Sequence, residues 1–161
     1  MGRVVTLQPW EYEHASQVGI GRYTRNWQRG DAVHYDRSKM EDDRTAQFAA
    51  AACELAVAKA TNRYWHAHVW DHRDHGKYKN LPDVGDNIEV RRCRTRDAVA
   101  VRRSDAGRVV FAARTVDDEF RRVELIGYIE ADKVIEGMAR DEKWTYVPFT
   151  SLKPFDSTGG R

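Results

Sequence analysis

The chain has 161 residues, of which 41% are hydrophobic and 32% are charged, with a formal net charge of +2 at pH 7. That length suits one domain with its own core, and no apolar run approaches the roughly 18 residues of a membrane span. Polar Gln8 and Glu11 follow the first residues, where a secretory leader would be apolar. We therefore expect a soluble cytoplasmic protein with one domain, residues 1–161.

Within that domain we expect three regions: a helical region at about 9–62, a sheet-rich core at about 64–138 and an irregular tail at about 139–161. Cys53 and Cys93 form neither a disulfide framework nor the paired motif of a zinc site, which predicts reduced thiols.

Positive charge is concentrated in residues 91–122, which contain ten arginines, no lysine and five acidic residues, a formal charge of +5. Arginine pairs well with phosphate, so this segment is compatible with a nucleic-acid-binding face. The alternative is that the arginines point outward from solvated strands, and charge by itself does not distinguish the two.

Near the N-terminus, Pro9 and the four-residue spacing of apolar side chains predict a helix over residues 9 to about 18. Gly19 and Gly21 are candidates to interrupt it. Arg22, Arg25 and Arg29 fall on one side of a possible continuation that also contains Trp27. They would contact a nucleic-acid backbone or line an amphipathic helix with Trp27 in the core. Residues 30–40 are expected to be a loop.

The next helix is predicted over residues 41–60, because it begins with three acidic residues and is rich in alanine. Phe48, Ala52 and Leu55 form an apolar stripe. Glu54 has only apolar neighbours one turn away in either direction. A carboxylate there needs a cation, a hydrogen bond or a metal, unless it reaches water at the border of the stripe.

Residues 64–80 hold four of the six histidines: His66, His68, His72 and His75. Their spacing matches no zinc motif, so a strand from Tyr64 to Trp70 leading into a polar loop is favoured over a metal site.

Short strands are then expected at 87–91, 98–101, 109–113 and 123–129. Residues 104–107 resemble a hairpin turn, residues 131–138 a short helix, residues 144–155 an irregular tail and residues 157–161 a frayed end.

Three acidic residues stand out along this order: Glu54 on a helix, Asp83 in a turn and Glu89 on a strand, with Arg91 two residues later. Alternation along the strand separates Ile88 and Val90 from Glu89 and Arg91. Converging carboxylates repel one another unless a divalent cation neutralises them, and oxygen ligands suit Mg²⁺ or Mn²⁺. The alternative is a charged surface hairpin with a Glu89–Arg91 pair.

Pro82-Asp83 and Glu89-Val90-Arg91, with the helical Glu54, resemble the PD-(D/E)XK nuclease superfamily over about residues 41–114. The resemblance implies an α/β fold with a mixed sheet flanked by helices, a restriction-endonuclease-like core. It also implies Mg²⁺-dependent DNA cleavage, with Asp83 and Glu89 as metal ligands, Glu54 as a direct or water-mediated third ligand and Arg91 as the phosphate or water partner.

The sequence departs from that family in two ways. Asp83 and Glu89 are closer than in many members, with Asp86 a competing ligand, and Arg91 stands where the family usually has lysine. Arginine does not serve as a base, so an inactive nucleic-acid-binding or interaction module is the alternative to an enzyme.

The expected partners are DNA and a second copy of the chain, with no membrane and no organic cofactor. The residues expected to contact DNA are Arg22, Arg25, Arg92, Arg94 and Arg96.

Overall fold

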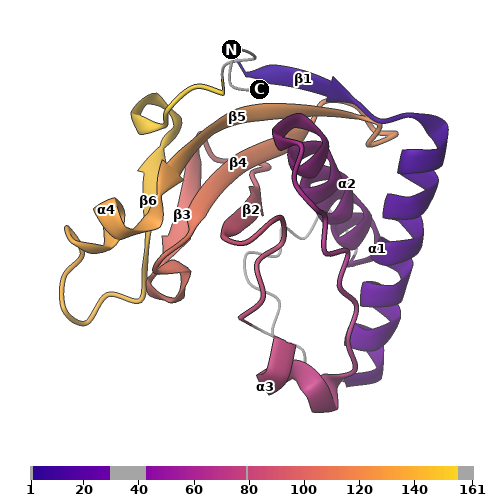
Figure 1. Ribbon diagram of the computed structural model, residues 1–161, viewed down its shortest axis with the longest axis horizontal. Coiled ribbons are helices and arrows are strands. Elements are labelled where there is room, and N and C mark those ends of the chain that lie inside the picture. Colours follow the sequence, from indigo (N-terminus) through magenta and orange to yellow (C-terminus); the bar gives the residue numbers. More distant parts are fainter. Residues whose placement is uncertain (1, 30–42, 79, 156–161) are drawn as a thin grey trace.

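The computed structural model describes residues 2–29, 43–78 and 80–155. They form a mixed α/β fold in which one long helix packs against a face of a curved sheet, a second long helix packs on the first, and a two-stranded ribbon lies beyond the other face of the sheet (Figure 1). This confirms the expectation of a mixed sheet with helices. Within these ranges no helix combines the length and the apolar character that crossing a bilayer requires.

The main sheet has four strands in the order β1-β5-β4-β2. β2 is parallel to β4, whereas β5 is antiparallel to both of its neighbours. A second sheet pairs β3 with β6 in antiparallel register. The strands are β1 (Arg3–Thr6), β2 (Ile88–Arg92), β3 (Ala98–Arg102), β4 (Val109–Thr115), β5 (Arg122–Glu130) and β6 (Trp144–Pro148).

This topology corrects two predictions. Residues 104–107 were expected to close a hairpin, but β3 leaves the main sheet to pair with β6, and the chain then returns to place β4 beside β2. Parallel strands need such a crossover, because a tight turn joins only antiparallel neighbours. Residues 144–155 are not an irregular tail throughout, since β6 supplies the partner that β3 requires. Strand β1 had not been expected at all.

The helices are α1 (Pro9–Arg29), α2 (Asp43–Thr61), α3 (His75–Tyr78) and α4 (Ala131–Ile135). α1 continues through Gly19 and Gly21, so the predicted interruption is wrong. A Cβ on Gly19 would lie 2.3 Å from Cδ1 of Phe48, which shows why this position is small: α1 and α2 approach closely there. The loop expected at 30–40, the side chains of Trp27 and Arg29, and residues 157–161 lie outside the described residues.

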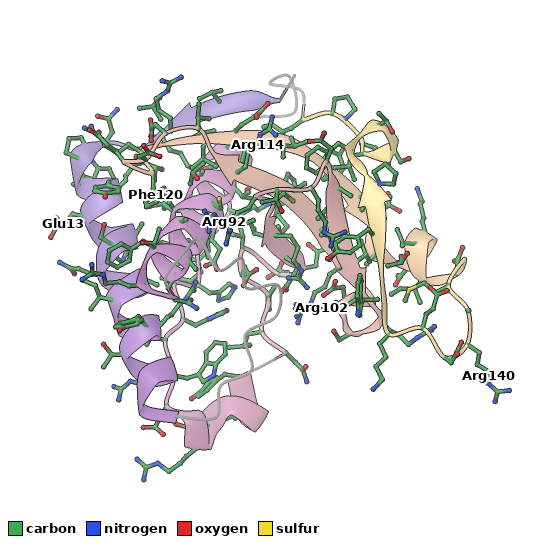
Figure 2. The ribbon with its side chains drawn as sticks, turned by 180° about the vertical axis from the view of Figure 1, so that it is seen from behind. Glu13, Arg92, Arg102, Arg114, Phe120 and Arg140 are labelled. Carbon is green, nitrogen blue, oxygen red and sulfur yellow. The ribbon has the colours of Figure 1, made fainter. Side chains whose placement is uncertain are left out.

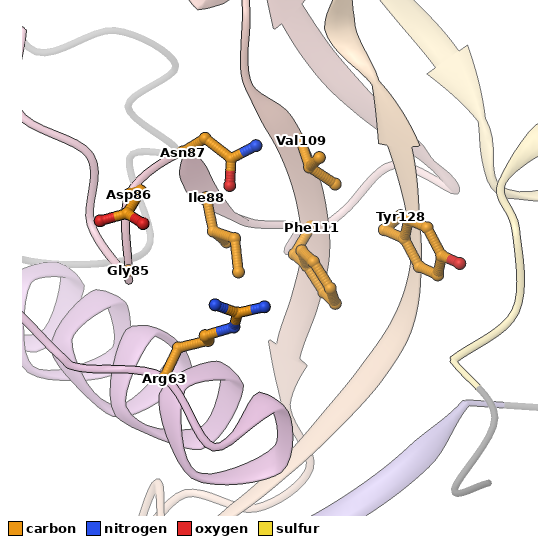
Figure 3. A pocket seen from close by; sticks show the side chains of 8 residues that line it. All are labelled: Arg63, Gly85, Asp86, Asn87, Ile88, Val109, Phe111 and Tyr128. Carbon is orange, nitrogen blue, oxygen red and sulfur yellow. The ribbon is translucent and has the colours of Figure 1, made fainter. Parts of the chain in front are cut away.

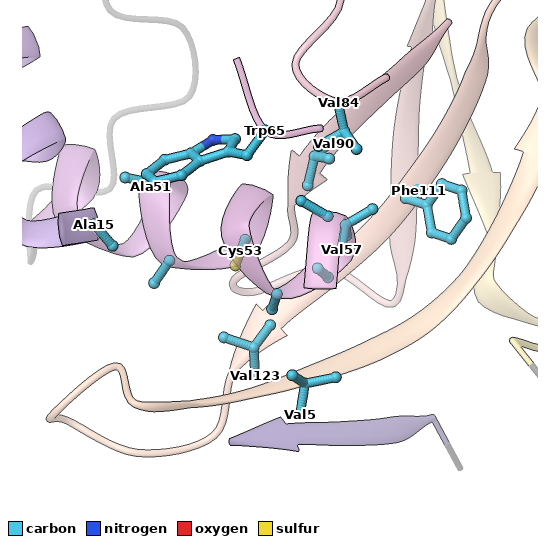
Figure 4. Packing of buried hydrophobic residues seen from close by; sticks show 14 of the residues in the cluster. Val5, Ala15, Ala51, Cys53, Val57, Trp65, Val84, Val90, Phe111 and Val123 are labelled. Carbon is cyan, nitrogen blue, oxygen red and sulfur yellow. The ribbon is translucent and has the colours of Figure 1, made fainter. Parts of the chain in front are cut away.

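Alternation along the central strands divides the interior into two cores. On the helical face, Phe111 and Ala113 of β4 pack with Val57 of α2 (Figure 4). On the other face, Val110 and Ala112 pack with Val99 and Val101 of the ribbon, together with Val147 and Ala131. Cys53 and Cys93 are buried free thiols, one in each core. β4 is therefore buried on both faces, and its apolar run reflects that position.

Residues 64–70 do not form the predicted strand. Only Trp65 makes a strand-like bridge, with Val84, and Ala67 has a left-handed backbone with φ of 48°. The polar groups of this segment bond instead to side chains and to a turn: the indole of Trp65 donates to Glu54, and the carbonyl of His68 accepts from Arg22. These individual contacts replace the ladder that alternation had suggested.

Candidate carboxylate site at the edge of the sheet

Asp83 lies against the free edge of β2. Its backbone N–H donates to the carbonyl of Ile88, and its Oδ2 accepts the N–H of Val90 at 2.8 Å. The turn between them therefore folds back on the strand that carries Glu89. Gly85 makes this turn possible through its φ of +57°, which a residue with a side chain rarely adopts. The short spacing between Asp83 and Glu89 is thus explained by a tight turn.

Glu54 is buried, with 7% of its surface exposed, and two residues satisfy it. Arg22 of α1 donates to both of its oxygens, at 2.7 and 2.9 Å, and the Trp65 indole donates to Oε2 at 3.0 Å. Burial raises the pKa of Glu54, but the charge of Arg22 and these hydrogen bonds outweigh it and hold the pKa below its usual value. The prediction that this carboxylate needs a partner is confirmed, and the partner is an arginine.

Glu89 is also enclosed by arginines. Its Oε1 accepts from Arg91 and its Oε2 from Arg108, each at 2.5 Å. Arg91 extends the network by donating to Asp105 at 2.8 Å, and Asp105 in turn accepts the N–H of Arg102. Asp105 is 2% exposed, so this ion-pair network extends into the interior and holds β2 against the segment that follows β3. The predicted Glu89–Arg91 pair exists, but it lies at the margin of the interior.

The three carboxylates do not converge on one point. Ile88 and Val90 pack in the core that α2 lines, so Glu89 projects from the opposite face of β2. Asp83 lies between, at the strand edge, within electrostatic reach of Glu54 from one face and of Glu89 from the other. Burial and then the charges of Glu54 and Glu89 raise the pKa of Asp83 well above its usual value.

His68 is the remaining member of the site. Its Nε2 lies 3.7 Å from Oδ1 of Asp83, and neither of its ring nitrogens has a hydrogen-bond partner among the described residues. Burial and the neighbouring charge of Arg22 lower the pKa of His68, so the imidazole is neutral at pH 7. Asp83 and His68 therefore face each other with donor and acceptor capacity that nothing in the described chain uses.

The donor chemistry at Asp83 fits a divalent cation, because a carboxylate oxygen and a neutral imidazole nitrogen are both metal ligands. The arrangement described is not a complete metal site: no group of three or more histidine, cysteine, aspartate or glutamate side chains within the described ranges is arranged to hold an ion. Glu89 would have to exchange an arginine partner to join Asp83 at a metal. Of His66, His68, His72 and His75, the last two have side chains outside the described residues.

Asp86, the competing ligand, belongs to a different feature. It is exposed and lines a cavity of about 230 Å³ with Gly85, Ile88, Phe111 and Arg63 (Figure 3). Because Ile88 belongs to the face opposite Glu89, this cavity opens away from Glu89. Asp86 therefore lies at the cavity side of the turn, away from Glu89.

Three of the arginines predicted to contact DNA do gather: Arg92, Arg94 and Arg96 line one groove of about 840 Å³ together with Arg91, Arg102 and Arg103. Figure 2 labels two of these side chains, Arg92 and Arg102. The other two lie elsewhere. Arg22 forms the buried pair with Glu54, and Arg25 on α1 lies 3.9 Å from Asp71. Sequence reasoning did not identify the roles of Trp65, His68, Asp105 and Arg108, because their partners are distant in the chain.

No family model, no curated protein and no solved structure matches the chain. The site is therefore interpreted from its own geometry.

Proposed function

We propose that the chain is a metal-dependent DNA endonuclease with a restriction-endonuclease-like core. The observation that carries the proposal is Asp83: a buried carboxyl group with a raised pKa, between two other acids and opposite the imidazole of His68, whose ring nitrogens have no hydrogen-bond partner among the described residues. Perturbed and unsatisfied groups of this kind concentrate at functional sites, because a purely structural network satisfies its members.

The neighbouring carboxylates illustrate that contrast. Glu54 and Asp105 each have two protein partners, as expected for buried charges that only stabilise a fold. Asp83 has the N–H of Val90 on one oxygen, and its other oxygen faces His68. The order of a helix bearing Glu54, a turn bearing Asp83 and a strand bearing Glu89, against a mixed sheet, supports the core assignment.

In this proposal Asp83 and Glu89 hold Mg²⁺ or Mn²⁺, with Glu54 acting through a water at most, since Arg22 and Trp65 occupy its oxygens. The ion supplies Lewis-acid stabilisation of phosphate charge and activation of water. Arg91 orients the phosphate, because it lines the arginine-rich groove while donating to Glu89. Double-strand cleavage requires two such sites, so a homodimer belongs to the proposal.

The test is nicking of supercoiled plasmid with Mg²⁺ or Mn²⁺ by the wild type and by Asp83→Asn, Glu89→Gln and Asp86→Asn. We expect the first two substitutions to lower the rate by at least about 100-fold, on the order of the loss of one preorganised electrostatic group. Asp86→Asn, in the same turn but away from Glu89, is the matched control and should retain activity. Equal nicking by all four proteins would show that the site is wrong.

The second candidate is a nucleic-acid-binding module without catalysis, and one observation favours it: both oxygens of Glu89 are already bound by guanidinium groups. On this reading the arginines replace the metal and the site only stabilises the turn. Absence of nicking with either ion, together with salt-sensitive DNA binding, would establish this function instead.

A further inference from the structure

The groove that Arg91 helps to line carries charge of one sign. Its lining includes Lys143 as well as the six arginines, and none of the described residues that line it is acidic. Besides Arg91, which donates to Glu89 and Asp105, two more of these arginines are held by contacts within the fold. Arg103 donates to the carbonyls of Ala139 and Glu142, and the guanidinium of Arg96 lies 4.6 Å from the ring centre of Tyr146. A preorganised set of cations of this density is complementary to a polyanion.

One wall of the groove is the outer face of the β3–β6 ribbon. The register pairs Ala100 with Tyr146 and Arg102 with Trp144, so these four side chains share a face, while Val99 and Val147 share the core face. Ala98 and Ala100 are small, which leaves the aromatic rings accessible beside them.

Trp144 is the most informative residue of this face. Half of its surface is exposed (51%), although tryptophan usually buries most of its ring. Its ring packs edge-on against Tyr146, with centroids 4.8 Å apart, so its orientation is fixed. An exposed, fixed indole among arginines has the composition of a base-stacking platform.

The chemistry selects among polyanions. A duplex presents phosphates but keeps its base faces stacked inside, so it would use the arginines and leave Trp144 idle. A peptide made of acidic residues would also use the arginines, but carboxylate side chains have no ring to stack. A single strand offers phosphates and unstacked bases together, and this combination matches both features of the groove.

Resting on the proposed function, we propose that the groove lined by Arg94, Arg96 and Trp144 binds single-stranded DNA, with a base stacked on Trp144. Arg91 belongs both to this groove and to the Glu89 network, so a strand in the groove leads to the carboxylate site. The substrate of the nuclease would then be single-stranded DNA, or a duplex that contains an unpaired segment.

The experiment measures anisotropy of a fluorescein-labelled dT12 probe, of a 12-base-pair duplex and of a labelled oligoglutamate peptide. We expect the wild type to bind dT12 more tightly than the other two. Trp144→Ala should weaken dT12 binding at least about fivefold, the effect of losing one stacked base, and should leave duplex binding within about twofold. Trp10→Ala is the matched control, since Trp10 is 70% exposed on α1, and it should not change affinity.

A double substitution, Arg94→Ala with Arg96→Ala, should weaken binding of both nucleic acids, with Arg73→Ala on the helical side of the molecule as its control. Equal affinity of wild type and Trp144→Ala for dT12, or preference for the duplex or for oligoglutamate, would overturn the proposal. The two proposals fail separately: Trp144-dependent binding without cleavage refutes only the nuclease, whereas cleavage that ignores Trp144 refutes only the single-strand groove.

Discussion

The carboxylate site and the arginine groove meet at Arg91, yet they differ in how their charged side chains are paired. In the carboxylate site, buried Glu54 and Asp105 have charged or hydrogen-bonding partners at contact distance. In the groove, the exposed cations Arg94, Arg96, Arg102, Arg103 and Lys143 gather without an acidic residue among the described lining. Burial explains the difference, because a desolvated charge without a partner is costly, while exposed like charges are screened by water and salt.

Asp83 is the exception on the buried side. It is as enclosed as Glu54, but burial and the charges of Glu54 and Glu89 outweigh the N–H of Val90 and the charge of Arg91, and the pKa of Asp83 is raised. Glu54 and Asp105 therefore stabilise the fold through their partners, whereas a charged Asp83 destabilises it unless a ligand binds there. Four experiments test that difference, from the largest expected effect to the smallest.

Removal of Glu54 should have the largest effect on stability. Glu54→Leu leaves Arg22 charged with 14% of its side chain exposed, and loss of one partner of a buried pair typically costs about 3–5 kcal/mol. The double variant Arg22→Met with Glu54→Leu should recover most of that free energy of unfolding in urea. Lys153→Ala, which breaks an exposed pair with Glu130, is the control and should change stability far less. A free energy of unfolding unchanged by Glu54→Leu would show that the pair is not needed.

Asp83→Asn should raise the free energy of unfolding, by a smaller amount than Glu54→Leu lowers it. The raised pKa of Asp83 means that its favourable contribution is complete below the unfolded pKa of 3.8 and is lost as pH rises towards the folded pKa. Without divalent cations, Asp83→Asn should therefore be more stable than wild type at pH 8, and the difference should shrink as pH falls to 4. Both proteins keep the Glu54 pair, so the comparison isolates position 83.

Addition of Mg²⁺ or Mn²⁺ extends the same measurement. A cation that binds Asp83 should stabilise the wild type at pH 8 and not Asp83→Asn, which reduces or reverses the gap in unfolding midpoint. A wild type that is already the more stable protein at pH 8 without metal would contradict the assignment of an unfavourable carboxylate.

Replacement of a single groove arginine should have the smallest effect. Arg94→Ala should leave urea unfolding almost unchanged, because Arg94 is exposed. If Arg94 contacts one phosphate, the slope of log affinity against log salt for dT12 should fall by about 0.7. If Arg94→Ala lowers the urea midpoint and leaves the salt slope unchanged, Arg94 stabilises the fold and does not contact a phosphate.

Much of the local structure was predictable, because it depends on patterns close in sequence. Strands β2, β4 and β5 and helix α2 follow from apolar runs and alanine content, and the unusual position of Glu54 was evident from its apolar neighbours. Alternation correctly separated Glu89 and Arg91 from Ile88 and Val90. The same alternation predicted a strand at Tyr64–Trp70, and this prediction was wrong, because the residues there make individual side-chain contacts instead of the hydrogen bonds of a β-sheet.

The sequence by itself determined the type of the elements with the clearest patterns, α1, α2, β2, β3, β4 and β5, and the charges that the protein carries, since periodicity and composition are local properties. Only the tertiary structure decided which charges meet: that Arg22 pairs with Glu54 across 32 positions, that β6 completes β3, and that Glu54 and Glu89 lie on opposite faces of β2. The reason is physical. A buried charge is satisfied by whatever element packing brings beside it, and packing is settled by the two cores together, not by spacing along the chain.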